Sequence, residues 1–268
     1  MTTPVTLLGP SGRMGQALLA AAGQRDDVRV AAALDRGDAP GQGRELVPGV
    51  VVTALIDAAL AAAPVYIDFT TSAATRAVAE VARGRRVAAV IGTTGLDATA
   101  QAAVDALAEV APVVAAPNFS VGVNLVLGLV AEAARVLGTS WDAEIVELHH
   151  KHKRDAPSGT ALGIARAIAA ARGQELTAVG RFSRDGDVGA RPAGEIGAVA
   201  VRGGDVVGEH TAYFFGAGER VEISHRATDR GIFAHGALRA ATWVVGKRPG
   251  RYDMLDVLGL RGGRGDRS

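Results

Sequence analysis

The amino-terminal stretch Val5–Gly15, with the sequence VTLLGPSGRMG, decides how the first half of the chain is interpreted. Four residues typical of a short buried strand run directly into glycines spaced G-x-x-G-x-x-G, and a helical pattern follows. Such a turn lets backbone N–H groups and the positive end of a helix bind a dinucleotide pyrophosphate. The commoner spacing is G-x-G-x-x-G, so the pattern alone fits a structural turn equally well. Its position in a first βα turn favours cofactor binding.

Apolar runs that resemble buried strands alternate with alanine-rich helical runs through the rest of the first half. The expected strands are 28–34, 50–52, 65–69, 87–91 and 112–115. The expected helices are 14–22, 56–63, 73–83 and 98–110. Strands that are apolar on both faces and alternate with helices predict a parallel sheet covered on both sides. We therefore predict an α/β fold whose N-terminal domain is a Rossmann-type, doubly wound sheet.

The pattern changes after residue 120. The expected elements there are helices 121–137, 159–171 and 232–245, and strands 143–148, 197–201, 206–215 and 220–223. The last three strands follow one another without a helix, which predicts a second domain of α+β type with a mixed, mostly antiparallel sheet. The polar, glycine-rich segment 172–192 is expected to be a loop, and 261–268 a frayed tail.

Composition excludes several classes of protein. The chain has 29 Lys and Arg against 28 Asp and Glu, which removes the overall electrostatic case for binding nucleic acid. It has no cysteine, so disulfides, thiolate catalysis and cysteine-based metal sites are excluded. We expect no membrane span, because even the apolar stretch 121–137 carries Asn124, Glu132 and Arg135. The N-terminus lacks a signal-peptide pattern, so we expect a cytoplasmic protein.

Polar residues follow several of the predicted strands. Asp35 and Arg36 come directly after the second strand, and Asp35 lies 23 positions beyond Gly12. An acidic residue there can bind the ribose hydroxyls of NAD, and an arginine the 2′-phosphate of NADP, so both cofactors stay open; the alternative is a solvated ion pair. Asp68-Phe69-Thr70 and Gly92-Thr93-Thr94-Gly95 end two later strands. They lie where α/β proteins bind ligands, although each also suits a helix cap.

The stretch 147–160, ELHHKHKRDAPSGT, is the most informative in the chain, because half of the six histidines lie in it beside several cations. A metal site would use His150 and His152 but has no adjacent third ligand. A nucleic-acid patch would need interleaved aromatic residues. An anion-binding catalytic loop explains more of the residues, because imidazole and ammonium groups transfer protons and bind carboxylates. Ser158 is a plausible N-cap that leaves N–H groups of Gly159 and Thr160 for a carboxylate.

Together these stretches resemble the dihydrodipicolinate reductase family of the bacterial diaminopimelate–lysine pathway. The motifs that carry the resemblance span nearly the whole chain: residues 9–15, 68–70, 92–95, 117–120, 149–160, 202–205, 208–211 and 252–254. The histidine loop with its DAPSGT extension is the most specific of them. The resemblance implies NADH- or NADPH-dependent reduction of 4-hydroxy-tetrahydrodipicolinate, with loss of water, by a homotetramer that acts on a small dicarboxylate and binds neither nucleic acid nor membrane.

The resemblance also implies a domain division and a set of site residues. Residues 1–119 would bind the dinucleotide, 120–228 would bind substrate and form subunit contacts, and 229–268 would return to the dinucleotide-binding domain. His149 would be the acid/base residue and Lys153 the proton donor, with substrate bound by His150, Gly159 and Thr160, and no metal. The implied cofactor-binding residues are Gly9, Pro10, Ser11, Gly12, Arg13, Met14, Asp35, Arg36, Gly92, Thr93, Thr94, Ala116, Pro117, Asn118 and Phe119.

Two alternatives remain open at this point. One is another NAD(P)-dependent reductase acting on an aspartate-derived acid. The other is a non-catalytic NAD(P)H sensor, which would have no reason to keep both a proton donor and a pocket for two carboxylates. At Asp35, related proteins often have glutamate, and the shorter aspartate should still reach a ribose hydroxyl.

Overall fold

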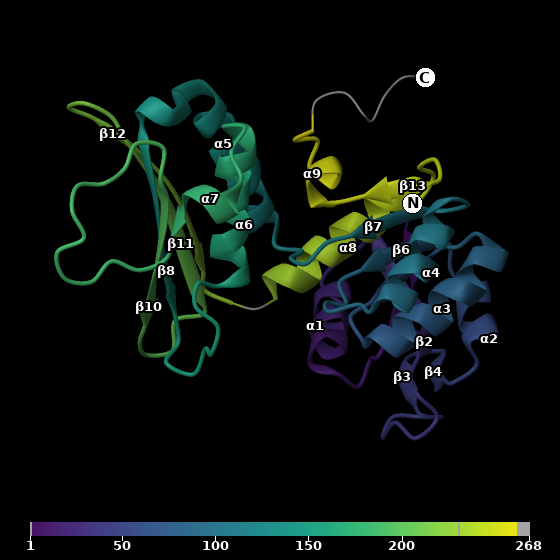
Figure 1. The fold of residues 1–268 in the computed structure, drawn as a ribbon. Coiled ribbons are helices and arrows are strands. Elements are labelled where there is room, and N and C mark those ends of the chain that lie inside the picture. Colours follow the sequence, from purple (N-terminus) through teal and green to yellow (C-terminus); the bar gives the residue numbers. More distant parts are fainter. Residues whose placement is uncertain (1, 230, 262–268) are drawn as a thin grey trace. The chain divides into compact units, whose positions relative to one another are not determined.

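The computed structural model describes residues 2–229 and 231–261, which divide into two compact units (Figure 1). The first unit contains the chain up to Val121 and returns from Gly231 onward, and the second begins at Gly122 and extends through the described residues up to 229. The chain therefore leaves the first unit once and comes back to it. Each unit has its own sheet and its own core.

The first unit is built on an eight-stranded sheet in the order β13-β7-β6-β5-β1-β2-β4-β3. Its strands are β1 (Thr3–Leu8), β2 (Val28–Leu34), β3 (Glu45–Val47), β4 (Val50–Thr53), β5 (Val65–Asp68), β6 (Ala88–Ile91), β7 (Pro112–Ala115) and β13 (Gly250–Tyr252). All neighbours pair in parallel except the β3–β4 hairpin at one edge. The strand order reverses direction at β1, which places the turn after β1 at a crevice where α/β sheets bind ligands.

Helices cover both faces of this sheet. They are α1 (Arg13–Ala22), α2 (Ile56–Ala61), α3 (Ser72–Arg85), α4 (Ala98–Ala108), α8 (Ile232–Val244) and α9 (Met254–Val257). Alternate residues of β1 point into two separate cores: Val5 and Leu7 pack with α1 and α8, and Leu8 packs with α2, α3 and α4. The sheet therefore has a hydrophobic core on each face, as a doubly wound sheet requires. The predicted doubly wound α/β fold is confirmed.

The second unit has a five-stranded sheet in the order β12-β11-β8-β10-β9. Its elements are α5 (Val121–Leu137), η1 (Gly138–Ser140), β8 (Asp142–His149), α6 (Gly159–Ala171), α7 (Leu176–Val179), β9 (Gly180–Arg181), β10 (Ile196–Arg202), β11 (Gly208–Phe215) and β12 (Arg220–Ala227). The central strand β8 is antiparallel to β11 but parallel to β10. The sheet is therefore mixed rather than mostly antiparallel, because α6 lies in the crossover between β8 and β10.

One face of this second sheet packs on α5 and α6, as Figure 1 shows. Ala143 and Ile145 of β8 contribute to that core together with Ile164 and Ile168 of α6. Because side chains alternate along a strand, Glu147 and His149 lie on the same helix-covered face. The pattern of β8 thus places two polar side chains at the end of an otherwise apolar row.

Several segments differ from the sequence-based expectation. The segment 172–192 is not all loop, because it contains α7 and β9. Strand β12 runs to Ala227, four residues beyond the expected end, because it pairs with β11 along its full length. The expected frayed tail lies outside the described residues from 262 onward, and Arg261 forms an ion pair with Asp253.

By length and composition, one helical stretch in the described part of the chain, Val121–Ser140, could cross a membrane. This differs from the expectation of no candidate span. The core helix of a globular protein can have the same length and composition. Val126, Val130 and Ala134 of this helix are buried in the core of the second unit.

Candidate active site

The turn after β1 is shaped by its three glycines. Gly9 has φ +63°, a conformation that side chains rarely adopt. A Cβ on Gly15 would lie 2.2 Å from the carbonyl oxygen of Gly9, so helix α1 packs directly on the turn. Gly12 is the N-cap of α1 and provides no side chain to cap it. The helix start therefore faces outward with backbone donors, as binding of a pyrophosphate requires.

A cavity of about 660 Å³ lies against this turn, entirely within the first unit. Of the sequence-predicted cofactor residues, it is lined by Gly9, Ser11, Gly12, Asp35 and Arg36. The N–H of Ser11 donates a hydrogen bond to Asp35 Oδ2 at 3.3 Å, which joins the glycine turn to the end of β2. A glycine turn that a Cβ at position 15 would obstruct, next to a carboxylate at the end of β2, fits an adenine dinucleotide.

The other predicted cofactor residues lie outside that lining. Pro10 is buried beneath the turn, where its carbonyl accepts a hydrogen bond from Gln16 at 2.7 Å, and Met14 packs on the core. Arg13 and Thr94 are exposed, and so is Pro117. The remaining ones belong to the ends of β6 and β7: Gly92, Thr93, Ala116, Asn118 and Phe119.

The ends of β5 and β6 are joined by the fully buried carboxylate of Asp68. Its Oδ1 accepts hydrogen bonds from the Thr70 N–H at 2.9 Å, the Thr70 hydroxyl at 2.6 Å and the Thr93 hydroxyl at 3.0 Å. Its Oδ2 accepts from Thr75 of α3 at 2.6 Å. These residues hold the segment after β5 in one conformation. The helix-cap alternative applies instead to Thr71, which caps α3.

Phe69 brings two more of the predicted residues together. Its ring packs edge-on against Phe119, with centroids 5.3 Å apart. A Cβ on Gly92 would lie 2.0 Å from the same ring, so only glycine fits there. Phe69 and Thr70 both line the cavity, although neither was among the predicted cofactor residues. Their position at the carboxyl end of β5 was the signal that pointed to them.

In the second unit, His149 ends β8 with its ring almost completely buried. Its Nδ1 lies 2.5 Å from Oε2 of Glu147, which is fully buried. Arg202 of β10 donates two hydrogen bonds to the same carboxylate, each 2.8 Å long. The register pairs Arg202 with His149 and, on the other side of β8, His210 with Glu147. Sequence reasoning assigned no role to these neighbours, because strand register is not visible in the chain itself.

Burial and hydrogen bonding set the charges of this cluster. Burial acts to raise the pKa of Glu147, but hydrogen bonds from Arg202, His149 and the Ser158 N–H outweigh it and lower that pKa. Burial lowers the pKa of His149, although Glu147 acts in the opposite direction. Burial also lowers the pKa of His210 to about 4. Near neutral pH the carboxylate is therefore ionised and both imidazoles are neutral.

The loop after β8 carries the other predicted catalytic residue, Lys153, and leads into α6, which contains two of the predicted substrate residues. Lys153 Nζ lies 2.9 Å from Asp155, an exposed carboxylate. Ser158 caps α6 by accepting the Ala161 N–H at 3.1 Å, which leaves Gly159 and Thr160 in the first turn of that helix. A Cβ on Gly159 would meet nothing within 4 Å, so the space next to it is open to a ligand.

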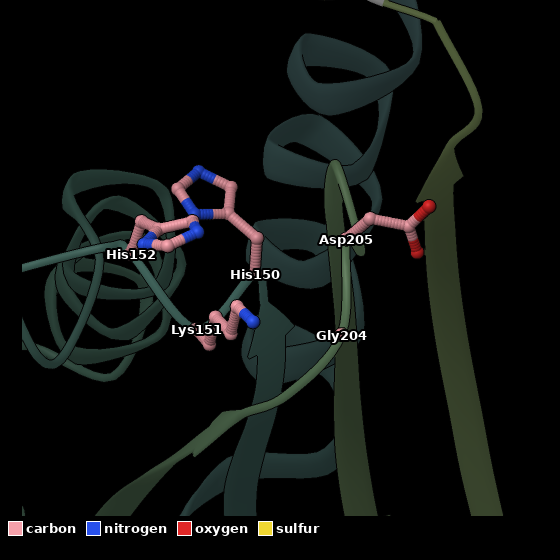
Figure 2. Close-up of a pocket in the computed structure, with 5 residues that line it drawn as sticks. All are labelled: His150, Lys151, His152, Gly204 and Asp205. Carbon is pink, nitrogen blue, oxygen red and sulfur yellow. The ribbon is translucent and has the colours of Figure 1, made fainter.

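His150 and His152 lie at an open cavity of about 510 Å³ on the second unit. Figure 2 shows their imidazoles close together, with Lys151 below them and Gly204 and Asp205 on the neighbouring segment. The ring centroids are 6.2 Å apart. No cluster of three or more potential metal ligands occurs in residues 2–229 and 231–261. The lining of this cavity thus combines three basic side chains with the carboxylate of Asp205.

The first unit has a doubly wound sheet with a glycine turn and an acidic strand end, and the second unit is rich in proton-transfer groups. Together with the relatives of this chain, these features define the class: an NAD(P)H-dependent oxidoreductase. The family described as "Dihydrodipicolinate reductase, N-terminus" matches residues 3–119, and its C-terminal counterpart matches residues 122–258. The chain belongs to the dihydrodipicolinate reductase family, and its cofactor is NADH or NADPH.

Curated relatives agree over the full length. A 4-hydroxy-tetrahydrodipicolinate reductase of Alkalilimnicola ehrlichii is 49% identical over 97% of this chain and 100% of its own. One of Thiobacillus denitrificans is 50% identical with the same coverage. The solved structure of a dipicolinate-bound dihydrodipicolinate reductase from Paenisporosarcina sp. TG-14 superposes with a TM-score of 0.79, at 26% identity, and covers 96% of this chain and 99% of that one.

Proposed function

We propose that this protein reduces 4-hydroxy-tetrahydrodipicolinate to tetrahydrodipicolinate, with loss of water, in the pathway to diaminopimelate and lysine. The observation that carries the proposal is the placement of His149 on a buried carboxylate, at the start of a loop that ends at the N-terminus of α6. That loop offers proton-transfer groups and anion-binding groups together. Relatives about half identical over the full chain bear the name of this activity.

In this proposal the second unit binds the substrate carboxylates. The first turn of α6, with Gly159 and Thr160, supplies backbone N–H groups and the positive end of the helix dipole to one carboxylate. His150, at the rim of the open cavity, is positioned to contact an anionic ligand as well. Two carboxylates on a small ring match this arrangement of donors.

His149 and Lys153 handle the proton. Loss of the 4-hydroxyl group and a ring hydrogen as water leaves a conjugated imine, and the reduced nicotinamide, when bound, supplies the hydride that adds to it. The electron density left on the product must be neutralised by a proton, which we assign to Lys153, with His149 as the acid/base residue. Lys153 forms an ion pair with Asp155, whose side chain is 59% exposed. Such exposed ion pairs are weak, so a substrate carboxylate can replace Asp155 as the partner of Lys153.

The first unit holds the cofactor. The glycine turn, from Gly9 to Met14, would bind the pyrophosphate, and Asp35 and Arg36 would contact the adenosine ribose or its 2′-phosphate. Thr93, Thr94 and the segment Ala116–Phe119 would lie near the nicotinamide end, where Asp68 orders the strand ends. These roles rest on the family resemblance and on the glycine turn described above.

We further propose a cytoplasmic homotetramer. The face of the second sheet opposite α5 and α6 carries apolar side chains that remain well exposed in the single chain: Val199 (43%), Val201 (45%) and Phe215 (38%). Apolar side chains grouped on one open sheet face are typical of subunit contacts. Light scattering on the purified protein measures the mass directly, and a monomer would contradict the tetramer.

One assay tests the activity. The protein is mixed with NADPH and with substrate freshly formed from pyruvate and aspartate semialdehyde, and the absorbance band of the reduced nicotinamide is followed. Oxidation of NADPH that depends on the substrate supports the reductase. Binding of NADPH without turnover would favour a sensor. Turnover only with another aspartate-derived acid would favour a different reductase on the same fold.

A further inference from the structure

Glu147 contacts residues of β8 and β10 and the residue that precedes α6. The reaction proposed above assigns it no role. Its carboxylate is completely buried and accepts hydrogen bonds from three directions. Oε2 faces His149 Nδ1 at 2.5 Å and Arg202 Nη1 at 2.8 Å. Oε1 accepts from Arg202 Nη2 at 2.8 Å and from the backbone N–H of Ser158 at 2.9 Å. A buried carboxylate with this many donors stays ionised and fixed in place.

The contact with His149 determines which ring nitrogen carries the proton. An ionised carboxylate only accepts hydrogen bonds, so neutral His149 must hold its proton on Nδ1. Nε2 is then the nitrogen left to exchange a proton with a ligand. Gly208 of β11 makes room for this ring orientation, because a Cβ there would lie 2.9 Å from Nε2.

The contact with Ser158 extends the effect to the substrate loop. The same carboxylate that orients His149 holds the N-cap residue of α6, whose first turn contains Gly159 and Thr160. Arg202 adds a second tether by donating to the carbonyl oxygen of Asp155 at 2.6 Å. Glu147 and Arg202 therefore hold the C-terminal end of the loop 150–158. The N-terminal end of this loop follows directly from β8.

We propose that Glu147 is a positioning residue for the reduction. It fixes the tautomer and direction of the His149 imidazole and, through Ser158, the position of the α6 N-terminus relative to that imidazole. The inference rests on the proposed function, since it names what orients the acid/base group of that reaction. Glu147 itself touches neither substrate nor cofactor in this assignment. It acts through His149 and Ser158, much as buried carboxylates orient catalytic histidines elsewhere.

Replacement of the charge without loss of volume tests the proposal. The charged and titratable groups that face His149 are Glu147 on β8, Lys153 on the loop, Arg202 on β10 and His210 on β11. In Glu147→Gln the attraction of the carboxylate is lost while the cations remain. The pKa of His149 should therefore fall further, and the neutral ring should no longer be restricted to the Nδ1–H form, because an amide can donate as well as accept.

The measurement combines NMR with kinetics. Imidazole ¹⁵N shifts, assigned by comparison with a His149→Gln sample, give the tautomer and pKa of His149 in wild type and in Glu147→Gln. Stopped-flow turnover gives kcat, which we expect to fall by about 10²-fold or more, as for a misoriented acid/base residue. The NADPH dissociation constant should be unchanged. Glu209→Gln is the matched control, because Glu209 lies in the same sheet and forms a surface ion pair with exposed Arg226 at 3.2 Å.

Two results would overturn the proposal. One is a Glu147→Gln variant whose His149 tautomer and pKa match wild type, whatever its kcat, since the carboxylate would then have a structural role only. The other needs no variant: wild-type His149 with its neutral proton on Nε2. Both readouts are independent of turnover. A wild-type protein that fails to oxidise NADPH would contradict the proposed function and leave this orientation test intact.

Discussion

The hydroxyl of Ser158 lies 3.0 Å from Nε2 of His210, so that the N-cap of α6 and strand β11 are joined by one buried hydrogen bond. Ser158 Oγ also accepts the N–H of Ala161, and its own proton is then available for His210. When the hydroxyl donates, Nε2 of neutral His210 accepts this hydrogen bond. Protonation of His210 would make Nε2 a donor, so the hydroxyl would have to rotate its own proton away from the ring at the start of the substrate-binding helix.

We predict that His210 makes the protein acid-sensitive. Burial lowers the pKa of His210 to about 4, against 6.5 for a free histidine, so the unfolded state binds more protons between these values. The stability contributed by neutral His210 is thus complete above pH 6.5 and declines as pH falls toward about 4. The difference corresponds to about 3 kcal/mol of unfolding free energy. Urea unfolding at a fixed protein concentration between pH 7 and 4 measures it.

The same titration on a variant isolates the contribution of this histidine. His210→Gln keeps a hydrogen-bonding side chain but cannot titrate, so its unfolding free energy should depend less steeply on pH across this window. His235→Gln, on α8 of the first unit, is the control and should follow wild type. Identical pH slopes in wild type and His210→Gln would show that other groups cause the acid sensitivity.

We predict that Lys153→Ala slows the chemical step while cofactor binding stays nearly normal. Lys153 belongs to the second unit, and the cavity assigned to the cofactor is lined by the first unit alone. Loss of a positioned proton donor typically lowers the rate by about 10²–10⁴-fold. Single-turnover reduction alongside an NADH titration separates the two effects. Lys247→Ala, which removes a lysine stacked on Trp243, should react at the wild-type rate. An unchanged rate for Lys153→Ala would remove this residue from the mechanism.

The glycine turn gives a prediction with a matched control in the same domain. In Gly15→Ala the new Cβ would lie 2.2 Å from the Gly9 carbonyl oxygen, so α1 must move away from the turn that is assigned to the pyrophosphate. We expect weaker NADPH binding in a fluorescence titration, together with a lower melting temperature. Gly84→Ala lies in α3 with no atom within 4 Å of its Cβ. It should stabilise the helix by about 0.5–1 kcal/mol and leave NADPH affinity unchanged.

The sequence predicted the fold class because strand and helix periods are local properties of the chain. The doubly wound sheet is confirmed, and so is the membership of the reductase family. The parallel pairing of β8 with β10 was not foreseen, because it depends on a crossover through α6 rather than on any short pattern. Arg202 was missed for the same reason, since it reaches Glu147 from 55 positions along the chain.

The polar strand ends were partly visible in the sequence. Asp68 was recognised as a residue at the ligand-binding edge, but its hydrogen bonds to Thr75 and Thr93 depend on how three elements meet. The catalytic and binding roles of the individual residues stay predictions, because they depend on which side chains meet a bound ligand. A pattern can indicate which residue types gather at an edge, whereas packing decides which of them touch.

The final prediction concerns the choice of cofactor. Arg36 is paired with Asp38 at 3.0 Å, but both side chains are mostly exposed, so the pair gives little stability and the guanidinium is available to a phosphate. Asp35 is held by the N–H groups of Ser11 and Arg36 and lines the cavity. We expect Arg36→Ala to weaken NADPH binding about tenfold, as loss of one charge-assisted contact implies, and to change NADH binding little. Titration of each variant with both cofactors measures this, and Arg44→Ala, a nearby arginine outside the cavity lining, serves as the control. Equal losses for NADH and NADPH in Arg36→Ala would show that this arginine does not bind the 2′-phosphate.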